Sequence, residues 1–304
     1  MLTTDYLYSL GYYSIPSFLI KYLDCQCIKR LKKISYFCGM DFASKSVYNF
    51  KEPISRYDHS LSCALNTWRL THRKKDTIAA LFHDVSTPIF SHVVDYMNKD
   101  FDKQESTEVY TEKVMKNDPA VYKCLSEDGL TIEEIANFKS FPIVDNDRPR
   151  LCADRFDGII LPGISWSKEV RKDDIPIYVS SLQVFINEDG QEEIGFNNEE
   201  VARKMVSISD NINRLCSSSF DNYMMLLLTE ITKKSIDQGL FTYDDLFILD
   251  EKFAFKTIER EGNKDINDLL YLFKNIQKED IPVTYIDNVK NKCLNPLVKG
   301  RRLY

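Results

Sequence analysis

A histidine and an aspartate stand next to each other inside an apolar stretch, and this pair constrains the fold more than any other feature of the sequence. His83 and Asp84 follow the apolar run 79–82 and precede Val85. Burying a carboxylate is costly unless a cation or several hydrogen-bond donors surround it. A metal ion would satisfy both side chains, because it compensates the aspartate charge and binds the neutral imidazole. The pair therefore indicates either a metal site or a buried histidine bonded to a neighbouring carboxylate.

Histidines are rare in this chain, which narrows the choice of metal ligands. The chain has four, and His59, His83 and His92 lie close together in the sequence. The segment between His59 and His83 has room for one helix and a return. The fourth, His72, lies in a basic stretch and is expected to be exposed.

Most of the sequence predicts helices. Glycine and proline number only 10 each, too few for a turn-rich all-β protein, and apolar residues recur at three- and four-residue spacing. One helix is expected to begin at Asp76 as its N-cap, and another is expected to end at Pro162-Gly163. The predicted helices cover residues 16–38 (one or two helices), 60–73, 76–82, 90–97, 103–138 (broken near 117–119 and again at 128–129), 150–160, 198–217, 223–238 and 243–259.

One short region predicts β-structure instead. Residues 177–196 alternate apolar and polar around Glu188-Asp189-Gly190, and Asp-Gly between such runs is typical of a β-hairpin. The expected fold is all-α with a small β-hairpin insertion and a helical C-terminal extension. The predicted divisions are a helical core over 1–170, the hairpin insertion over 171–198, and a helical C-terminal region over 199–304 packed on the core.

Charge and hydropathy argue against several classes of protein. The net charge of −6 and the pI of about 5.4 disfavour non-specific binding to nucleic acid. The most apolar run, 224–228, is far shorter than the roughly 20 residues that span a bilayer. The N-terminus lacks the pattern of a secretion signal, so a cytoplasmic protein with eight reduced cysteines is expected. The basic tail 299–302 is expected to be a solvated or disordered end.

Several motifs together resemble the HD superfamily of metal-dependent phosphohydrolases, and most closely its branch of deoxynucleoside triphosphate triphosphohydrolases. The motifs are Arg30-Leu31-x-x-Ile34, Arg56-x-x-His59-Ser60, His83-Asp84, Ile89-Phe90-Ser91-His92 and Asp154-Arg155-Phe156-Asp157. The resemblance is strong over residues 30–157 and weaker, though in the same order, to about residue 260. It implies that the helical core has the HD-domain fold.

The resemblance also implies a metal centre and a hydrolytic reaction. The matching metal ligands are His59, His83, Asp84 and Asp154. They would hold one divalent ion (Mn, Fe, Ni, Zn or Mg), since two imidazoles and two carboxylates do not select among these ions. The implied reaction is attack of metal-activated water on a phosphate ester or anhydride.

Further residues match positions around the reaction site. Arg56 and Arg155 match phosphate contacts, and pairing with Asp157 or another surface acid is the less favoured alternative for Arg155. Asp84 and His92 are the expected catalytic residues. The alternative interpretation of His92 is that it caps a helix.

Several positions depart from the pattern of that branch. Thr87 stands in place of a catalytic-region histidine, and Gln104-Glu105 stand in place of a His-Glu pair. Tyr36 replaces a glutamine that contacts the base, and Pro162 lies near the place of an aspartate that contacts the sugar. The chain therefore retains the residues that match metal ligands, but it lacks the residues that contact the base and the sugar in that branch.

These features leave several functions open. The first is a phosphohydrolase acting on a small phosphorylated compound, with nucleotides among the candidates. The second is a catalytically silent sensor that binds a metal and a nucleotide, and the third is a helical interaction module. A homo-oligomer is an additional expectation, because members of that branch assemble. An aromatic N-terminus would either cover a partner or pack on its own domain, and it comprises Tyr6, Tyr8, Tyr12 and Tyr13.

Overall fold

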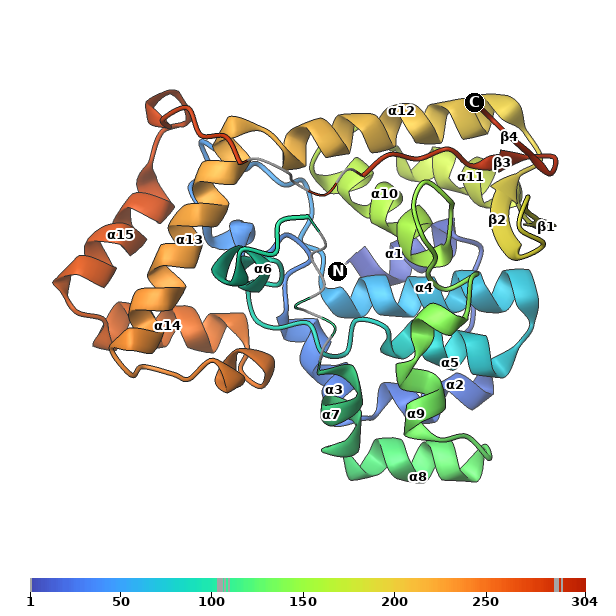
Figure 1. Ribbon diagram of the computed structural model, residues 1–304, viewed down its shortest axis with the longest axis horizontal. Coiled ribbons are helices and arrows are strands. Elements are labelled where there is room, and N and C mark those ends of the chain that lie inside the picture. Colours follow the sequence, from blue (N-terminus) through green and yellow to red (C-terminus); the bar gives the residue numbers. More distant parts are fainter. Residues whose placement is uncertain (1, 103–105, 107, 109, 287–289, 291) are drawn as a thin grey trace.

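The fold was analysed in a computed structural model, which describes residues 2–102, 106, 108, 110–286, 290 and 292–304, with side chains from residue 6 onward. Two of the predicted site residues, Gln104 and Glu105, lie outside the described residues. Most of the chain is helical, and a small sheet lies at one end (Figure 1). Among the described residues, every helix is too short or too polar to cross a lipid bilayer.

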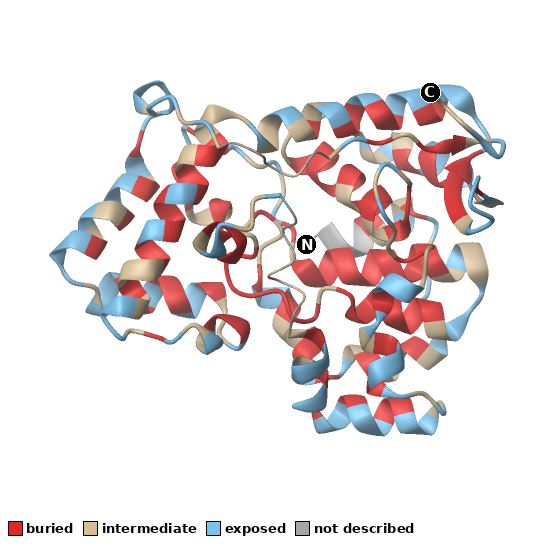
Figure 2. Ribbon diagram, viewed as in Figure 1, coloured by how far each residue is buried: buried red, intermediate tan, exposed pale blue. Residues whose placement is uncertain are grey.

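A long buried helix, α4 (Arg56–Thr71), lies at the centre of the molecule between α5 (Lys74–Phe82) and α10 (Ala153–Ser165). It begins with a capping box, in which Ser55 Oγ accepts from the Asp58 amide and Asp58 accepts from the Ser55 amide. Its first three turns are buried on every side, as Figure 2 shows. This helix therefore has no solvated face there, and its polar residues must find partners inside the protein.

Two groups of short helices, one before α4 and one after α5 in the sequence, cover one side of the core. The N-terminal helices are α1 (Leu2–Ser9), α2 (Ser17–Leu23) and α3 (Gln26–Arg30), and the later group is α7 (Thr111–Lys116), α8 (Pro119–Glu127) and α9 (Ile132–Ala136). α9 packs on α5, and α8 packs on α2. The breaks predicted near 117–119 and at 128–129 are confirmed, because they fall between α7 and α8 and between α8 and α9.

The C-terminal helices form the opposite side of the molecule. They are α12 (Glu199–Cys216), α13 (Ser219–Asp237), α14 (Glu251–Glu261) and α15 (Lys264–Asn275). α12 packs on α10, and α13 packs on α6 (Val93–Asn98), which places the C-terminal helices against the N-terminal core (Figure 1).

The sheet has four strands, two more than predicted. They are β1 (Leu182–Ile186), β2 (Glu192–Phe196), β3 (Leu297–Val298) and β4 (Arg301–Arg302), in the order β1-β2-β3-β4. The predicted hairpin is present, but residues 175–180 form helix α11 (Ile175–Ser180). The basic tail, expected to be a free end, forms β4. Gly195 permits this pairing, because a Cβ there would lie 2.6 Å from the Leu297 carbonyl oxygen.

The two helix boundaries that were predicted from a capping residue and from a proline are wrong. α5 begins at Lys74, and Asp76 lies in its first turn, where its carboxylate pairs with Arg73 Nε at 2.9 Å. α10 continues through Pro162 to Ser165. The proline removes one backbone hydrogen bond, but the helix around it is buried and apolar, so packing maintains the helix.

The aromatic N-terminus packs mainly on its own chain. Tyr6 is fully buried and donates a hydrogen bond to Asp157, while the Tyr12 hydroxyl donates to the Leu65 carbonyl. Tyr8 and Tyr13 are exposed and stack on each other with ring centroids 5.8 Å apart.

Candidate metal centre

Three of the four predicted ligands, His59, His83 and Asp154, bring their donor atoms together, and Asp84 borders them. Nε2 of His59, on α4, lies 2.9 Å from Asp154 Oδ1 and 3.2 Å from Nε2 of His83, which follows α5. Asp84 has one carboxylate oxygen 3.9 Å from His59 Nε2 and the other 4.0 Å from His83 Nε2. Donor atoms at these separations surround a space of the size that one ion occupies, since bonds to nitrogen and oxygen measure about 2.0–2.2 Å for zinc.

Hydrogen bonds at the far side of each ring orient the two imidazoles. His59 Nδ1 lies 2.7 Å from Asp157 Oδ2, and His83 Nδ1 lies 2.7 Å from the Ala80 carbonyl oxygen. Because both partners are acceptors, each Nδ1 carries a proton and each Nε2 faces the centre. The two Nε2 atoms lie 3.2 Å apart beside the Asp154 carboxylate, where a metal ion would take the place of a proton as their common partner. The donor set therefore fits a divalent metal ion.

The charge around the centre keeps its carboxylates ionised. Burial by itself raises the pKa of Asp84, but Arg56 Nη1 at 2.9 Å and the two histidines hold that pKa below its ordinary value. Burial likewise raises the pKa of Asp154, whereas hydrogen bonds to His59 and His83 lower it well below the ordinary range. Both groups are thus available as charged ligands at neutral pH.

A cysteine also lies within reach of the centre, and its sulfur is grouped with the donor atoms of His59, His83 and Asp154. Cys63, one turn after His59 on α4, has its Sγ 3.6 Å from His59 Nδ1 and 3.8 Å from Nε2. Because these two distances are nearly equal, the sulfur packs against the ring and does not lie along the Nε2 lone pair. The Cys63 thiol contacts the Ala153 carbonyl oxygen at 3.7 Å.

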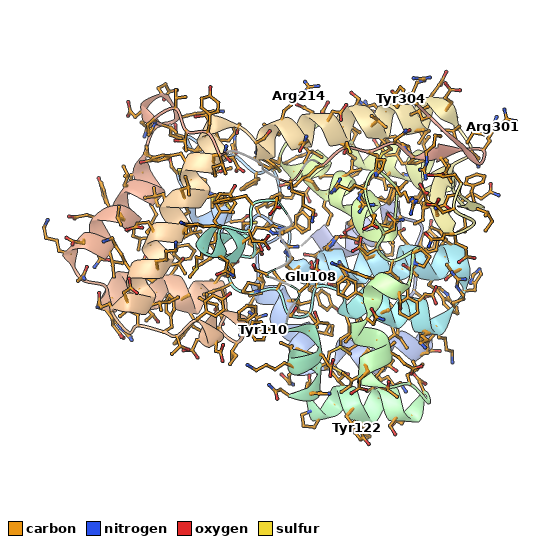
Figure 3. All side chains as sticks on the ribbon, in the orientation of Figure 1. Glu108, Tyr110, Tyr122, Arg214, Arg301 and Tyr304 are labelled. Atoms are coloured by element: carbon orange, nitrogen blue, oxygen red, sulfur yellow. The ribbon has the colours of Figure 1, made fainter. Side chains whose placement is uncertain are left out.

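The centre opens into a cavity of about 740 Å³. The predicted site residues that line it are Arg56, His83, Asp84, Thr87, His92, Asp154 and Arg155, and Tyr36 lines it as well. His59 is almost completely buried behind them. Glu108, another lining residue, lies near the middle of the molecule (Figure 3). A cavity of this size accepts a drug-sized organic compound, well beyond inorganic phosphate.

His92 faces this cavity from a strained turn. Its Nδ1 lies 2.7 Å from Asp95 Oδ2, and Asp95 is fully buried. His92 occupies the N-cap position of α6, but its side chain makes no capping hydrogen bond. The two preceding residues have positive φ angles, 61° at Phe90 and 47° at Ser91, a conformation that is uncommon outside glycine. Glu251 accepts a hydrogen bond from the Phe90 amide at 3.1 Å and so holds this turn.

Arg155 is engaged by the loop that precedes α10. Its Nη1 donates to Asn146 Oδ1 at 2.7 Å and to the Arg150 carbonyl, and its Nη2 donates to the Asn146 carbonyl at 2.7 Å. Asp145 completes the group as an ion-pair partner at 3.6 Å. Of the two arginines predicted to contact phosphate, Arg155 therefore has its terminal nitrogens occupied within the protein.

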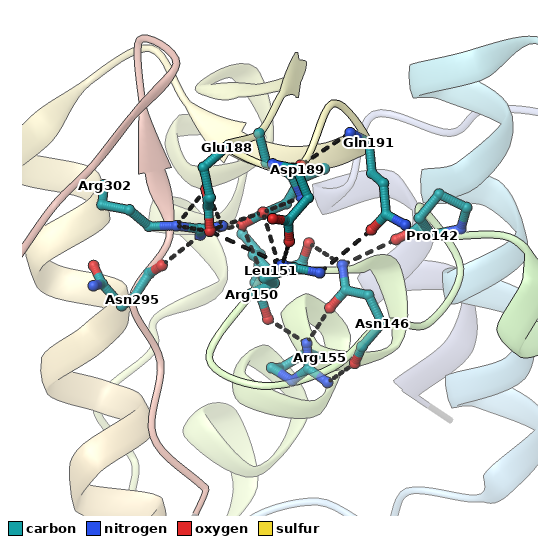
Figure 4. Close-up of polar contacts among 12 residues, drawn as sticks. Pro142, Asn146, Arg150, Leu151, Arg155, Glu188, Asp189, Gln191, Asn295 and Arg302 are labelled. Carbon is teal, nitrogen blue, oxygen red and sulfur yellow. Dashed lines mark hydrogen bonds and ion pairs between the residues drawn. The ribbon is translucent and has the colours of Figure 1, made fainter.

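The same loop is tied to the sheet and the C-terminal tail. Arg150 contacts Asp189 in the turn of the hairpin, and Arg302 on β4 pairs with Glu188 and with Glu193, which is fully buried (Figure 4). The hairpin and the tail thereby fix the loop that leads into α10 and its Asp154.

The sequence did not assign a role to two residues that support the centre. Asp157 lies one turn after Asp154 on α10, and this i,i+3 spacing was the available signal. The role of Tyr6 could not be predicted from the sequence, because the Asp157 side chain that its hydroxyl contacts lies 151 positions away.

Comparison with known proteins gives two distant relatives. No family model matches the chain. The metal-dependent phosphohydrolase cns2 of Cordyceps militaris is 27% identical over 132 residues, which cover 43% of this chain and 37% of that protein. The uncharacterized protein YdhJ of Bacillus subtilis is 29% identical over 155 residues, which cover 51% of this chain and 45% of that protein. The chain thus spans less than half of the length of either relative.

Proposed function

We propose that this chain is a metal-dependent phosphohydrolase of the HD superfamily, with His59, His83, Asp84 and Asp154 as ligands of one divalent ion. One observation carries the proposal: two imidazoles, each with Nδ1 bonded to an acceptor, direct their Nε2 atoms at one point beside two carboxylates. The name of the fungal relative supports the same class of reaction. The ion is Mn, Fe, Ni, Zn or Mg, because this mixed donor set suits each of them.

The residues around the centre have complementary tasks in this proposal. A divalent ion would supply Lewis acidity toward a phosphoryl oxygen and lower the pKa of a water molecule. Arg56 uses Nη1 to hold Asp84, and its buried Nε makes no hydrogen bond within the described part of the chain. Arg56 is therefore the proposed phosphate contact. Arg155, whose guanidinium is bonded to the loop at Asn146, would reach phosphate only by giving up those bonds.

Proton transfer is assigned to His92. Asp95 accepts from its Nδ1, which leaves Nε2 to exchange a proton in the cavity. The His92–Asp95 pair favours an enzyme over a catalytically silent sensor, because His92 can transfer a proton. Thr87, which stands in place of a catalytic-region histidine, cannot do so. The proposed substrate is a small phosphorylated compound. Deoxynucleoside triphosphates belong in the test panel, since the ligand motifs resemble that branch.

The first test compares metal content in matched histidine variants. The wild-type chain and His72→Asn are expected to hold about one equivalent of metal, whereas His83→Ala is expected to hold almost none. His72 is the appropriate control because it is exposed and does not line the cavity. The metal-loaded protein would then be assayed against phosphate monoesters, diesters and nucleoside triphosphates. Equal metal content in all three proteins, or no release of phosphate from any compound, would contradict the proposal.

A further inference from the structure

A second cleft, with a volume of about 490 Å³, borders the C-terminal end of α10. Among the described residues, it shares no lining residue with the cavity at the metal centre. Its lining includes four cations and two acids, namely Lys51, Lys168, Arg171, Lys172, Glu52 and Asp173. The cleft is therefore basic, although the whole chain has a net charge of −6.

The cleft forms because the chain turns back onto α10 after the helix ends. Lys168 has a positive φ angle of 60°, and the Val170 amide donates a hydrogen bond to the Gly163 carbonyl at 3.0 Å. Gly163 permits this close approach, because a Cβ there would lie 2.5 Å from Val170 Cγ2. Residues 168–173 are thereby held against α10, and their basic side chains form one wall of the cleft.

Two of the four cations have no counter-charge in the protein. Lys172 pairs with Glu52 at 3.0 Å, and Arg171 pairs with Asp174 at 3.4 Å. The amino groups of Lys51 and Lys168, both exposed, form neither an ion pair nor a hydrogen bond within the described part of the chain. Cations gathered around one concave surface repel each other, and an anion between them would relieve this repulsion.

The last turn of α10 offers few acceptors that could bind these lysines in place of an anion. The carbonyl group of Pro162 accepts from the Trp166 and Ser167 amides at 2.8 and 3.0 Å, and that of Gly163 is bonded to Val170. The Ser165 carbonyl accepts from the Lys51 amide at 2.9 Å. The orphan carbonyl groups of a helix end are thus mostly satisfied within the protein.

One hydrogen-bonded wall separates the cleft from the cavity at the metal centre. Ser165 is fully buried, and its hydroxyl donates to the Glu52 carbonyl at 2.6 Å and accepts from the Glu52 amide at 3.2 Å. Phe50 and Trp166 flank this contact, line the cavity at the metal centre and have ring centroids 6.0 Å apart. A ligand bound by Lys51 would therefore act on a residue next to Phe50 in the chain.

We propose that this cleft binds a phosphate group through Lys51 and Lys168, at a site separate from the metal centre. A phosphate group fits because it carries a charge of about −1.5 to −2 at pH 7 and its oxygens accept hydrogen bonds from ammonium groups. A soluble phosphorylated compound and a lipid headgroup present the same group, so the experiment has an arm for each. The inference does not depend on the proposed hydrolytic reaction.

The chain allows a direct test, because it has only two tryptophans. Trp68 packs on Phe18 with centroids 4.9 Å apart and lines neither cavity. In Trp68→Phe, Trp166 alone emits, and it lies beside the wall between the two cavities. This metal-loaded protein would be titrated with inorganic phosphate at constant ionic strength.

Two double variants in the same background identify the binding site. Lys51→Gln/Lys168→Gln removes the proposed contacts, and Lys204→Gln/Lys256→Gln removes the same charge at exposed positions outside both cavities. Each lysine of the cleft is expected to contribute roughly 2- to 5-fold to the affinity, as an exposed ion pair does. The change in Trp166 emission should therefore require roughly 4- to 25-fold more phosphate in the first variant. The control should match the parent, and any signal from phosphate at the metal centre is common to all three.

The second arm measures cosedimentation of the full chain with phosphatidylcholine vesicles that contain or lack phosphatidic acid. Binding of free phosphate without binding of either vesicle would assign the site to a soluble compound. Binding of the phosphatidic acid vesicles that Lys51→Gln/Lys168→Gln abolishes would assign it to a lipid headgroup. Equal phosphate titrations in both double variants, with no vesicle binding that depends on the two lysines, would overturn the inference. The metal content and the rate of phosphate release would stand in that case, because neither involves this cleft.

Discussion

Asp157 Oδ2 lies 2.7 Å from Nδ1 of His59, and both side chains are almost completely buried. The other oxygen of this carboxylate accepts a hydrogen bond from the Tyr6 hydroxyl. The first helix of the chain is thereby connected to the candidate metal centre through one carboxylate. Since Asp157 contacts the face of the centre away from the cavity, it acts on the orientation of the ligand and does not touch the substrate.

Replacing Asp157 by asparagine is expected to weaken metal binding about 10- to 100-fold, the usual effect of losing a partner that orients a ligating histidine. The amide accepts less strongly from His59 Nδ1, so the ring is held less firmly. The measurement is competition for the metal by a chelator of known affinity. Asp237→Asn, at an exposed position on α13 outside the cavity, serves as the control. Unchanged metal affinity in Asp157→Asn would show that His59 is oriented by its packing alone.

Removal of the Tyr6 hydroxyl tests the same connection through stability. Tyr6→Phe leaves a buried carboxylate oxygen of Asp157 without its donor, which costs about 1–3 kcal/mol of the free energy of unfolding. Urea denaturation would measure the change. Tyr8→Phe, on the same helix but exposed, is expected to change the stability by less than about 0.5 kcal/mol. Equal effects of the two substitutions would contradict the role given to the Tyr6–Asp157 contact.

His92→Gln is expected to lower kcat by about 10²- to 10⁴-fold, the range for losing a group that transfers a proton. The metal content should stay at the wild-type level, because His92 is outside the ligand set. The rate of phosphate release and the metal content would be measured on the same preparation, with His72→Asn as control. A loss of both together would instead place His92 in the metal centre.

Glu251 is expected to make stability depend on pH. Burial raises its pKa from an ordinary value of 4.5 to about 7, against the lowering effect of hydrogen bonds from the Ser35 and Phe90 amides. Asp41 raises the pKa further and Arg56 lowers it. The folded state therefore keeps a proton that the unfolded chain releases, so this contribution is complete below pH 4.5 and is lost as the pH rises to about 7.

Glu251→Gln removes that titration. Between pH 4.5 and about 7, the free energy of unfolding of the wild type should fall relative to the variant by an amount on the order of 3 kcal/mol. Urea denaturation of both proteins at several pH values gives the difference, which cancels the titration of other buried acids such as Asp221. Parallel curves for the two proteins would rule out a raised pKa at Glu251.

The candidate ligand residues were predicted from the sequence because the motifs that carry them resemble those of the HD superfamily, and the chemistry of the residues is consistent with that resemblance. A histidine and an aspartate inside an apolar run must be compensated, and the chain has only four histidines from which a second imidazole can come. Many of the helices could also be predicted from the spacing of apolar residues. The observed bounds of α12 and α13, for example, lie close to the predicted ranges. The hairpin was predicted from its Asp-Gly turn, which depends on a local backbone conformation.

Contacts between distant parts of the chain were decided only by the tertiary structure. The pairing of Leu297 with Gly195 adds two strands that no local pattern distinguishes from a solvated tail. Tyr6 contacts Asp157, and Glu251 contacts Phe90, across about half of the length of the chain. Local spacing determines which residues share a helix face, but the partner of a buried polar group is set by the packing of whole elements. The sequence therefore determined the helices and the residues able to bind a metal, and the tertiary structure decided how these residues are oriented and what else borders their cavity.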